Sequence, residues 1–485
     1  MRVVVMKFGG SSVVDATAIG RVMSIVEGER SRGRSPVVVV SALGGVTDRL
    51  LALAEAARTG NANGEVEEGV AALHRRHVDE AARLGADADG ALLPAVDRHF
   101  DDLRGALETI GHRRAADPVL LDVIAAAGEL LSSRLVAAAM TARGLPAAWV
   151  DARQAIITND THMCAAPLMD ETAVAAVAAV SPLLTDGAIP VLGGFVGCTA
   201  DGVTTTLGRG GSDYSASLVG AAIHAAEIQI WTDVDGMLTA DPRIVDDAEV
   251  VPHLSFAEAA ELAYFGAKVL HPSTIFPAVS RNIPVRILNS HRPERPGTLI
   301  TADPPPADRH RPFAALACKR GITILDITST RMLMAHGFLR RVFEAFEVNA
   351  TAVDVVTTSE VSVSVTIDDN RRGADIVAAL LEIAEVTVEE QMAILTVVGD
   401  RLTTHSALAA RIVGALTGFP LRMVSQAASR RNVTIVLPEA SLAPAMRHLH
   451  RELFAGASRA ASSTVAPAKV LGAEASAKAA EPGAR

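Results

Sequence analysis

The stretch Arg2–Ser12, RVVVMKFGGSS, joins a continuous β-branched run to a glycine pair and two serines. A run without polar alternation predicts a strand buried on both faces, here at Arg2–Met6, and a helix is expected from about Asp15. Lys7 and the glycines fall in the turn between them. There, backbone N–H groups and one ammonium could hold a phosphate group. Taken alone, the turn is equally consistent with an ordinary strand–helix connection.

The same unit recurs along the N-terminal 300 residues. Val37–Val40 is a second predicted strand, followed by the glycine turn Ser41–Val46, and Ile189–Leu192 is a third that ends in two glycines. Repeated strand–turn–helix units predict an α/β fold in which helices sandwich a mostly parallel sheet. Residues 49–115 are helical in pattern and charged, which indicates a helical cover over that sheet.

The composition of the 485-residue chain excludes several classes of protein. Apolar residues make up 49% and charged residues 21%, which argues against wholesale disorder. A net charge of −10 with 3% aromatic residues disfavours nucleic-acid binding. Three widely spaced cysteines offer neither a disulfide framework nor a CxxC metal site, and no apolar run approaches the roughly 20 residues that span a bilayer. The start lacks a signal-peptide pattern, so a cytoplasmic protein is expected.

An internal repeat follows a proline-rich linker. At an offset of about 70 residues, Ile324 corresponds to Ile394, and Val342 to Ile412. Each copy reads strand, helix, strand, turn, strand, which predicts two small α+β modules suited to ligand sensing. The predicted domains are a catalytic-looking domain (1–300), a linker (301–315), a first module (316–388), a second module (389–456) and a disordered tail (457–485).

A second glycine motif lies in Thr204–Gly220, TTTLGRGGSDYSASLVG. Three glycines surround Arg209, and Ser212 or Asp213 is expected to cap the helix that follows. A helix start attracts anions, and an arginine can clamp a carboxylate with two hydrogen bonds. The alternative interpretation is a plain helix cap with a solvated arginine.

Two further segments carry polar groups suited to phosphate chemistry. Ile230–Arg243, IWTDVDGMLTADPR, places Thr232 and Asp233 after a strand, where ligands bind in open α/β sheets; a surface turn is the alternative. In Ser255–Pro272, Ser255 and Glu258 form a capping box, and the helix is expected to break at Gly266. Lys268 follows and could serve as a second cation near a transferring phosphoryl group.

Together these motifs resemble those of aspartate kinases, in the amino acid kinase superfamily. The segment 353–368, VDVVTTSEVSVSVTID, is similar to the signature of that family's first ACT regulatory domain. The likeness covers residues 1 to about 456 and is strongest to the monofunctional, lysine-regulated type. The other motifs that carry it are KFGGSS (7–12), SALGGVTD (41–48), GRGGSDYSA (208–216), WTDVDG (231–236), DPR (241–243) and FGAKVLHP (265–272).

The resemblance implies an amino acid kinase fold followed by two ferredoxin-like ACT domains. It also implies a phosphotransferase with a carboxyl acceptor, which converts ATP and L-aspartate into ADP and 4-phospho-L-aspartate at the start of lysine, threonine and methionine biosynthesis. The chemistry of the acceptor agrees with this reaction. A β-carboxylate has a reference pKa of about 3.9, so it is ionised at neutral pH and needs no general base. The enzyme has to supply alignment and charge stabilisation.

Residue roles follow from the same resemblance. The catalytic residues would be Lys7, Asp213 and Lys268, with Asp213 ordering the lysines. Aspartate would be bound by Thr47, Glu129, Arg209 and Ser212. ATP would be bound by Lys7, Gly9, Gly10, Ser11, Thr232, Asp233, Arg243 and Lys268, with Mg²⁺ bridging its phosphates and no metal ligands assigned to the protein. An amino acid effector would be bound by Met332, Gly337, Phe338, Leu339, Asp354, Thr358, Ser359 and Glu360.

The sequence departs from the family pattern at three positions. Leu238 stands where lysine-regulated relatives often have tyrosine, Met334 replaces a histidine, and Ala352 replaces a serine. Lysine or threonine is the expected effector, and the ACT domains are expected to pair in a homodimer or a tetramer. Partners of other classes, nucleic acid and membrane, are not expected.

Two other functions compete with this interpretation. The first is a related acyl-phosphate-forming kinase that acts on glutamate, N-acetylglutamate or carbamate. The second is a non-catalytic amino acid sensor with a degenerate kinase domain. The presence of Lys7, Arg209, Asp213 and Lys268 favours a working kinase over a sensor.

Overall fold

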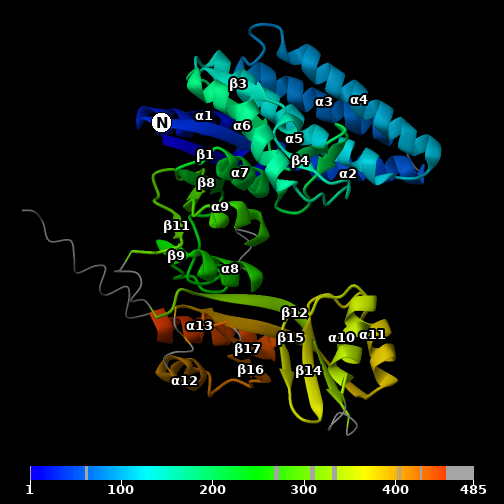
Figure 1. Cartoon of the computed structure of the whole chain (residues 1–485), viewed down its shortest axis with the longest axis vertical. Coiled ribbons are helices and arrows are strands. Elements are labelled where there is room, and N and C mark those ends of the chain that lie inside the picture. Colours follow the sequence, from blue (N-terminus) through cyan, green and yellow to red (C-terminus); the bar gives the residue numbers. More distant parts are fainter. Residues whose placement is uncertain are drawn as a thin grey trace, which may run out of the picture.

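A computed structural model of the chain describes residues 2–60, 64–266, 272–305, 312–329, 336–400, 402, 406–426 and 429–454. An N-terminal α/β unit occupies one end of the elongated molecule and a β-rich unit the other (Figure 1). The predicted tail, 457–485, lies outside the described residues. Among the helices that the structure describes, none has the length and apolar character needed to cross a membrane.

The N-terminal unit is built on an eight-stranded sheet, as predicted. Its strand order is β3-β5-β2-β1-β8-β10-β11-β9, and every neighbouring pair is parallel except β10 and β11. The strands are β1 (Arg2–Phe8), β2 (Arg34–Val40), β3 (Ala147–Val150), β5 (Ile189–Gly193), β8 (Glu227–Thr232), β9 (His253–Ser255), β10 (Val285–Asn289) and β11 (Thr298–Thr301). A small second sheet joins β4 (Ile157–Thr158), β6 (Val196–Thr199) and β7 (Thr204–Thr206).

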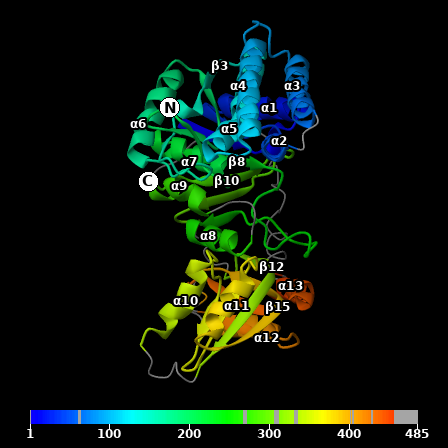
Figure 2. The same cartoon turned by 90° about the vertical axis from the view of Figure 1, so that its right-hand side faces the viewer.

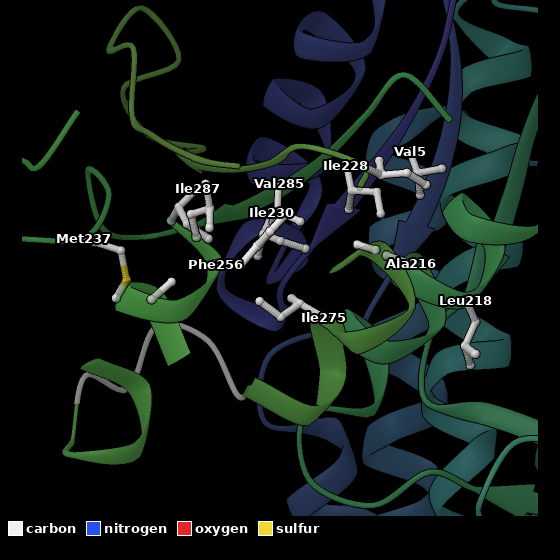
Figure 3. Close-up of a cluster of buried hydrophobic side chains, with 14 of the residues drawn as sticks. Val5, Ala216, Leu218, Ile228, Ile230, Met237, Phe256, Ile275, Val285 and Ile287 are labelled. Atoms are coloured by element: carbon white, nitrogen blue, oxygen red, sulfur yellow. The ribbon is translucent and has the colours of Figure 1, made fainter. Parts of the chain in front are cut away.

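Helices bury both faces of the large sheet. Alternate residues of β1 belong to different cores: Val3 and Val5 to one, Val4 and Met6 to the other. Figure 3 shows side chains of the first core, among them Ile230 of β8 and Ala216 of α7. This core is covered by α6 (Met169–Thr185), α7 (Gly211–Ala222), α8 (Phe256–Tyr264) and α9 (Phe276–Ser280). The second core is covered by α1 (Ala16–Ser31), α2 (Val46–Thr59), α3 (Glu65–Leu84) and α4 (Leu92–Arg113). Helix α5 (Pro118–Ala142) contributes side chains to both cores.

Two of the three helix starts predicted from the sequence are observed. The Asp15 carboxylate accepts a hydrogen bond from the Ala18 N–H at 2.8 Å, and Ser255 and Glu258 form the predicted capping box. The start of α7 differs from the prediction, because its N-cap is Gly210 at φ 73° without a side-chain cap. The left-handed backbone of a glycine starts this helix. Ser212 and Asp213 therefore lie inside its first turn, where their side chains are free for other contacts.

The C-terminal unit consists of two modules that share one six-stranded sheet, in the order β13-β14-β12-β15-β17-β16. Val342 and Ile412, which the sequence repeat pairs, are both fully buried, the first in the core of one module and the second in the core of the other. Four helices, α10 (Phe338–Val348), α11 (Gly373–Leu381), α12 (Ser406–Ala415) and α13 (Glu439–Phe454), pack on β12 (Ala315–Thr328), β13 (Val356–Thr358), β14 (Ser362–Ile367), β15 (Glu385–Val398), β16 (Met423–Ser425) and β17 (Asn432–Pro438).

The second module includes a strand segment from ahead of the first module. The second half of β12 lies between β14 and the first half of β15, within the first module. Its first half, Ala315–Lys319, instead pairs with Ile394–Val398 beside β17, within the second module. The fourth strand of the second module thus comes from the chain ahead of the first module. This pairing crosses the boundary that the sequence predicts between the modules.

The N-terminal unit contacts this sheet at two places. Helix α8 packs against β12 and β15 between the two units, and Gly266 follows it at φ 114° (Figure 1, Figure 2). A Cβ at Gly266 would lie 2.2 Å from the Cys318 carbonyl oxygen, so only glycine fits there. In the second contact, the Thr239 hydroxyl hydrogen-bonds His450 Nε2 at 2.9 Å. The segment that follows β8 is thereby attached to the second module.

Candidate active site

A pocket of about 300 Å³ lies at the edge where the carboxyl ends of β1, β2 and β5 meet. This is the edge at which parallel α/β sheets bind ligands. The glycine loop that starts α7 forms one side of the pocket. The residues that line it are Lys7, Ser41, Thr47, Glu129, Phe195, Gly208, Gly210, Gly211, Ser212 and Asp213.

Lys7 and Asp213 form an ion pair inside this pocket. Lys7 Nζ lies 2.6 Å from Asp213 Oδ1, and the two side chains are only 12% and 14% exposed. Strand β1 supplies the lysine and the first turn of α7 supplies the aspartate, which is available because Gly210 caps the helix. A Cβ on Gly9 would stand 3.6 Å from Lys7 Nζ, which places this glycine beside the ammonium.

Glu129 is a buried carboxyl group with an unmet hydrogen-bonding capacity. Burial raises its pKa to about 8, and the Ala42 backbone N–H offsets only part of that effect. Its Oε2 has no hydrogen-bond partner, although it lines the pocket. A Cβ on Gly193 would lie 2.9 Å from the Glu129 carbonyl oxygen, so this glycine lets α5 approach β5 closely. An orphaned buried carboxyl is suited to a cationic ligand group.

Two lining residues were missed in the sequence. Ser41 donates a hydrogen bond to Ser212 Oγ at 3.2 Å, and its place in the SALGGVTD motif was an available signal. Phe195 adopts φ 65°, and its N–H donates to Ser215 Oγ at 2.9 Å. No local pattern distinguishes this phenylalanine from a core residue, because its position depends on contacts distant in the chain.

Of the predicted nucleotide residues that the structure describes, Lys7 lines the pocket and the others are not among its lining residues. Gly10 starts a 3₁₀ turn (Gly10–Val13) and Ser11 is exposed. Thr232 ends β8, whose Trp231 pairs with Phe8 of β1, so it lies on the same sheet edge as Gly9. Asp233 is exposed, and Arg243 is 78% exposed and pairs with Asp241 at 2.7 Å. Arg209 is exposed between lining glycines, and Lys268 lies outside the described residues.

The predicted effector residues are distributed over the first module: Asp354 lies beside Thr366, and Thr358 and Ser359 lie beside Val363 and Ser362 at the other end of β14. Lys319 Nζ is 2.7 Å from Asp354 and 3.2 Å from Asp368, and the Tyr264 ring lies 4.8 Å from the same ammonium. Phe338 is buried in the module core, whereas Leu339 is 40% exposed. Gly337 caps α10 at φ 81°, Ser359 Oγ lies 2.7 Å from Ser362 Oγ, Thr358 and Glu360 are exposed, and Met332 lies outside the described residues.

The fold and this pocket are those of an amino acid kinase. The chain matches the model of the amino acid kinase family over residues 2–289 and that of an ACT domain over residues 395–453, so it belongs to the amino acid kinase family. Within that family it is an aspartate kinase with C-terminal ACT domains, because its similarity to aspartokinases extends over most of the chain.

Three comparisons carry this assignment. The lysine-sensitive aspartokinase 3 of Escherichia coli is 37% identical over 93% of this chain and 99% of its own. A crystal structure of E. coli aspartokinase III in complex with aspartate and ADP superposes with a TM-score of 0.79 at 36% identity, covering 93% of this chain and 100% of the other. A crystal structure of the same enzyme in complex with lysine and aspartate superposes with a TM-score of 0.78 at 36% identity, covering 93% of this chain and 99% of the other.

Proposed function

We propose that this aspartate kinase transfers the γ-phosphoryl group of ATP to the β-carboxylate of L-aspartate in the pocket beside Lys7. The observation that carries the proposal is the orphaned carboxyl of Glu129 in the same pocket as the Lys7–Asp213 pair. The Glu129 carboxyl suits the ammonium of an amino acid, and the Lys7 ammonium suits a phosphoryl group. A pocket of about 300 Å³ is also of a size suited to a small ligand.

The chemical step requires alignment more than proton transfer. A β-carboxylate oxygen attacks the γ-phosphorus, the bond from phosphorus to the β–γ bridging oxygen breaks, and ADP leaves without a proton changing place. Negative charge moves onto the bridging oxygen, and the Lys7 ammonium stabilises it. Asp213 holds that ammonium at 2.6 Å and so fixes its position. Lys268 completes the proposed catalytic set.

Substrate recognition is assigned to groups around the same pocket. Glu129 would accept the α-ammonium, and Arg209 at the rim would clamp the α-carboxylate, supported by Thr47 and Ser212. Glutamate is one methylene longer, so its γ-carboxylate would be misplaced when both α-groups are held. A misplacement of about 1 Å can cost a factor of about 100 in rate. Discrimination against glutamate is therefore expected.

ATP would lie along the sheet edge from the first glycine turn towards the end of β8. Gly9, Gly10 and Ser11 would contact phosphates, and Thr232 and Asp233 the rest of the nucleotide, with Arg243 nearby. Mg²⁺ would arrive with ATP, held by its phosphates, and would neutralise part of their charge.

The effector proposal centres on Asp354. An amino acid effector such as lysine or threonine carries an ammonium that would replace Lys319 Nζ on this carboxylate. Asp354→Asn is expected to raise the concentration of effector for half-inhibition at least about tenfold, since a buried charge pair is lost. Asp369→Asn is the matched control, because Asp369 pairs with the exposed Arg371 and should leave that concentration unchanged. Equal shifts in both variants would contradict the assignment.

Homodimer formation through the ACT modules is part of the same proposal. Val356, Val361, Val388 and Val424 are all at least 36% exposed on strands or turns of the shared sheet. Exposed apolar side chains gathered on one unit favour association. Sedimentation of the full chain, with and without amino acids, tests it, and a monomer under both conditions would refute it. The free thiols of all three cysteines favour a reducing cytoplasmic setting.

The experiment that tests the proposed function is aspartyl hydroxamate formation from ATP, Mg²⁺ and L-aspartate. We expect turnover with aspartate and at most about 1% of that rate with L-glutamate. Added lysine and threonine would identify the effector. A folded protein without turnover on any of these substrates would instead support a non-catalytic amino acid sensor.

A further inference from the structure

Helix α5 carries a second buried carboxylate, Asp122, seven residues before Glu129. Its side chain is fully buried and is not among the residues that line the pocket. A buried carboxylate is costly unless several donors satisfy it, and the proposed reaction gives this one no chemical role. Its surroundings therefore indicate what it does.

Three donors from two separate segments converge on this carboxylate. Asp122 Oδ1 accepts a hydrogen bond from the Thr206 hydroxyl at 2.5 Å, and Oδ2 lies 2.7 Å from His162 Nδ1. The Met163 backbone N–H lies 3.0 Å from Oδ1 and 3.2 Å from Oδ2. Met163 adopts φ 67°, a left-handed conformation that is costly for a side-chain residue. The carboxylate thus holds a strained turn in place.

Both segments lead to the glycine loop of the pocket. Thr206 is the last residue of β7 and precedes Leu207-Gly208-Arg209-Gly210-Gly211. Its carbonyl accepts the Ala165 N–H at 2.8 Å, which ties the two segments together. A Cβ on Gly208 would stand 3.1 Å from Cys164 Sγ and 3.4 Å from the Met163 carbonyl oxygen. The turn next to His162 therefore forms the surface on which Gly208 rests.

We propose that Asp122 is a positioning residue that fixes the glycine loop 207–211, and through it the site for the α-carboxylate of aspartate. The inference rests on the proposed function, in which Arg209 on this loop holds that carboxylate. Glu129 and Asp122 then act from one rigid helix: the first binds the ammonium directly, and the second sets the distance to the loop that binds the carboxylate.

The test compares Asp122→Leu with Asp122→Asn. Leucine leaves the three donors without their acceptor, which removes what holds the turn and the end of β7 in place. We expect the KM for aspartate to rise at least about tenfold, while the KM for ATP and kcat change less than about threefold. Asparagine retains an acceptor oxygen for Thr206 and Met163, and its amide can donate to His162. It should restore the KM for aspartate to within about threefold of the wild type.

A readout besides activity comes from Cys164, which is exposed and adjacent to Gly208. Its rate of alkylation, followed residue by residue with mass spectrometry, should increase at least about threefold in Asp122→Leu and remain unchanged in Asp122→Asn. Thr206→Val provides a second variant that keeps the carboxylate. It should raise the KM for aspartate about threefold or more, even where Asp122→Leu fails to fold.

Ser133→Ala is the matched control, because Ser133 is a buried polar residue of α5, about three helical turns beyond Asp122, that accepts a hydrogen bond from Trp149 Nε1 and takes no part in the Asp122 contacts. Its KM values should match the wild type. The inference is overturned where Asp122→Leu and Thr206→Val leave the KM for aspartate unchanged, or where kcat and both KM values shift together in Ser133→Ala as well. A wild type that forms no aspartyl phosphate refutes the proposed function instead.

Discussion

Replacing Lys7 or Asp213 with alanine is expected to abolish turnover while the fold stays intact. Lys7→Ala removes the ammonium that would stabilise the transferring phosphoryl group. Asp213→Ala removes the carboxylate that lies 2.6 Å from this ammonium and is its only described ion-pair partner. Loss of one preorganised stabilising group costs about 10²–10³ in kcat, and loss of a full charge should reach the upper end. Hydroxamate formation measures the rate, and circular dichroism measures the fold.

The matched control for this pair lies at the opposite edge of the same sheet. Arg34, at the start of β2, pairs with the buried Glu29 at 2.8 Å. Arg34→Ala breaks an ion pair of similar geometry, so it should reduce thermal stability and leave kcat within about twofold. Near-normal rates in Lys7→Ala or Asp213→Ala would refute the catalytic roles. A similar loss of rate in Arg34→Ala would indicate that any broken ion pair at this sheet lowers the rate by disturbing the fold.

Glu129→Gln is expected to raise the KM for aspartate at least about 100-fold. A glutamine would leave the substrate ammonium buried without a counter-charge, and breaking a buried charge pair costs about 3–5 kcal/mol. Glu80→Gln is the control, because Glu80 is a buried glutamate that accepts the Ala16 N–H at 2.6 Å at another place in the same unit. An unchanged KM in Glu129→Gln would remove this residue from the substrate site.

The pKa of Glu129 adds a pH dependence with a definite sign. Because burial raises that pKa to about 8, the free enzyme holds a proton that the substrate ammonium must displace. The KM for aspartate should fall by up to about tenfold per pH unit as pH rises towards 8 and then level off. Glu129→Gln should show no such slope. A wild-type KM that is flat between pH 6 and 8 would contradict the ammonium assignment.

The same group affects stability in the opposite direction. Its pKa lies above the unfolded value of about 4.5, so between these two values the folded state binds more protons than the unfolded state. The contribution of Glu129 to stability is therefore present below about pH 4.5 and is lost as pH rises to about 8. Glu129→Gln should gain thermal stability relative to the wild type across that range, which melting at pH 5, 7 and 9 measures.

Local signals predicted most of the fold. The run at Arg2–Met6 and the cap at Asp15 depend on burial and on neighbours within a few residues, and both are observed. The start of α7 was mispredicted because serine and aspartate are good caps in isolation. In the structure, Gly210 with its left-handed backbone is the N-cap instead. The ion pair between Asp213 and Lys7 joins residues far apart in the sequence, so only the three-dimensional structure shows it.

The candidate site was predicted less completely, for a related reason. A glycine motif singled out Lys7 and the family resemblance singled out Glu129, and the structure brings both into the lining of one pocket. Phe195 and Asp122 were not found, since neither stands in a glycine motif and each acts through partners far along the chain. Hydrogen bonds between residues 40 or 84 positions apart leave no periodic pattern in a sequence.

The shared strand of the ACT modules has a consequence for how the chain is made. During synthesis, Ala315–Lys319 leaves the ribosome before the whole first module, while its partner Ile394–Val398 follows only afterwards. The early segment stays unpaired along one edge until Ile394–Val398 has been made, and the second module lacks a strand until the two segments pair. The two modules therefore mature as a single cooperative body, and a gene fragment that begins after Lys319 would encode an incomplete sensor.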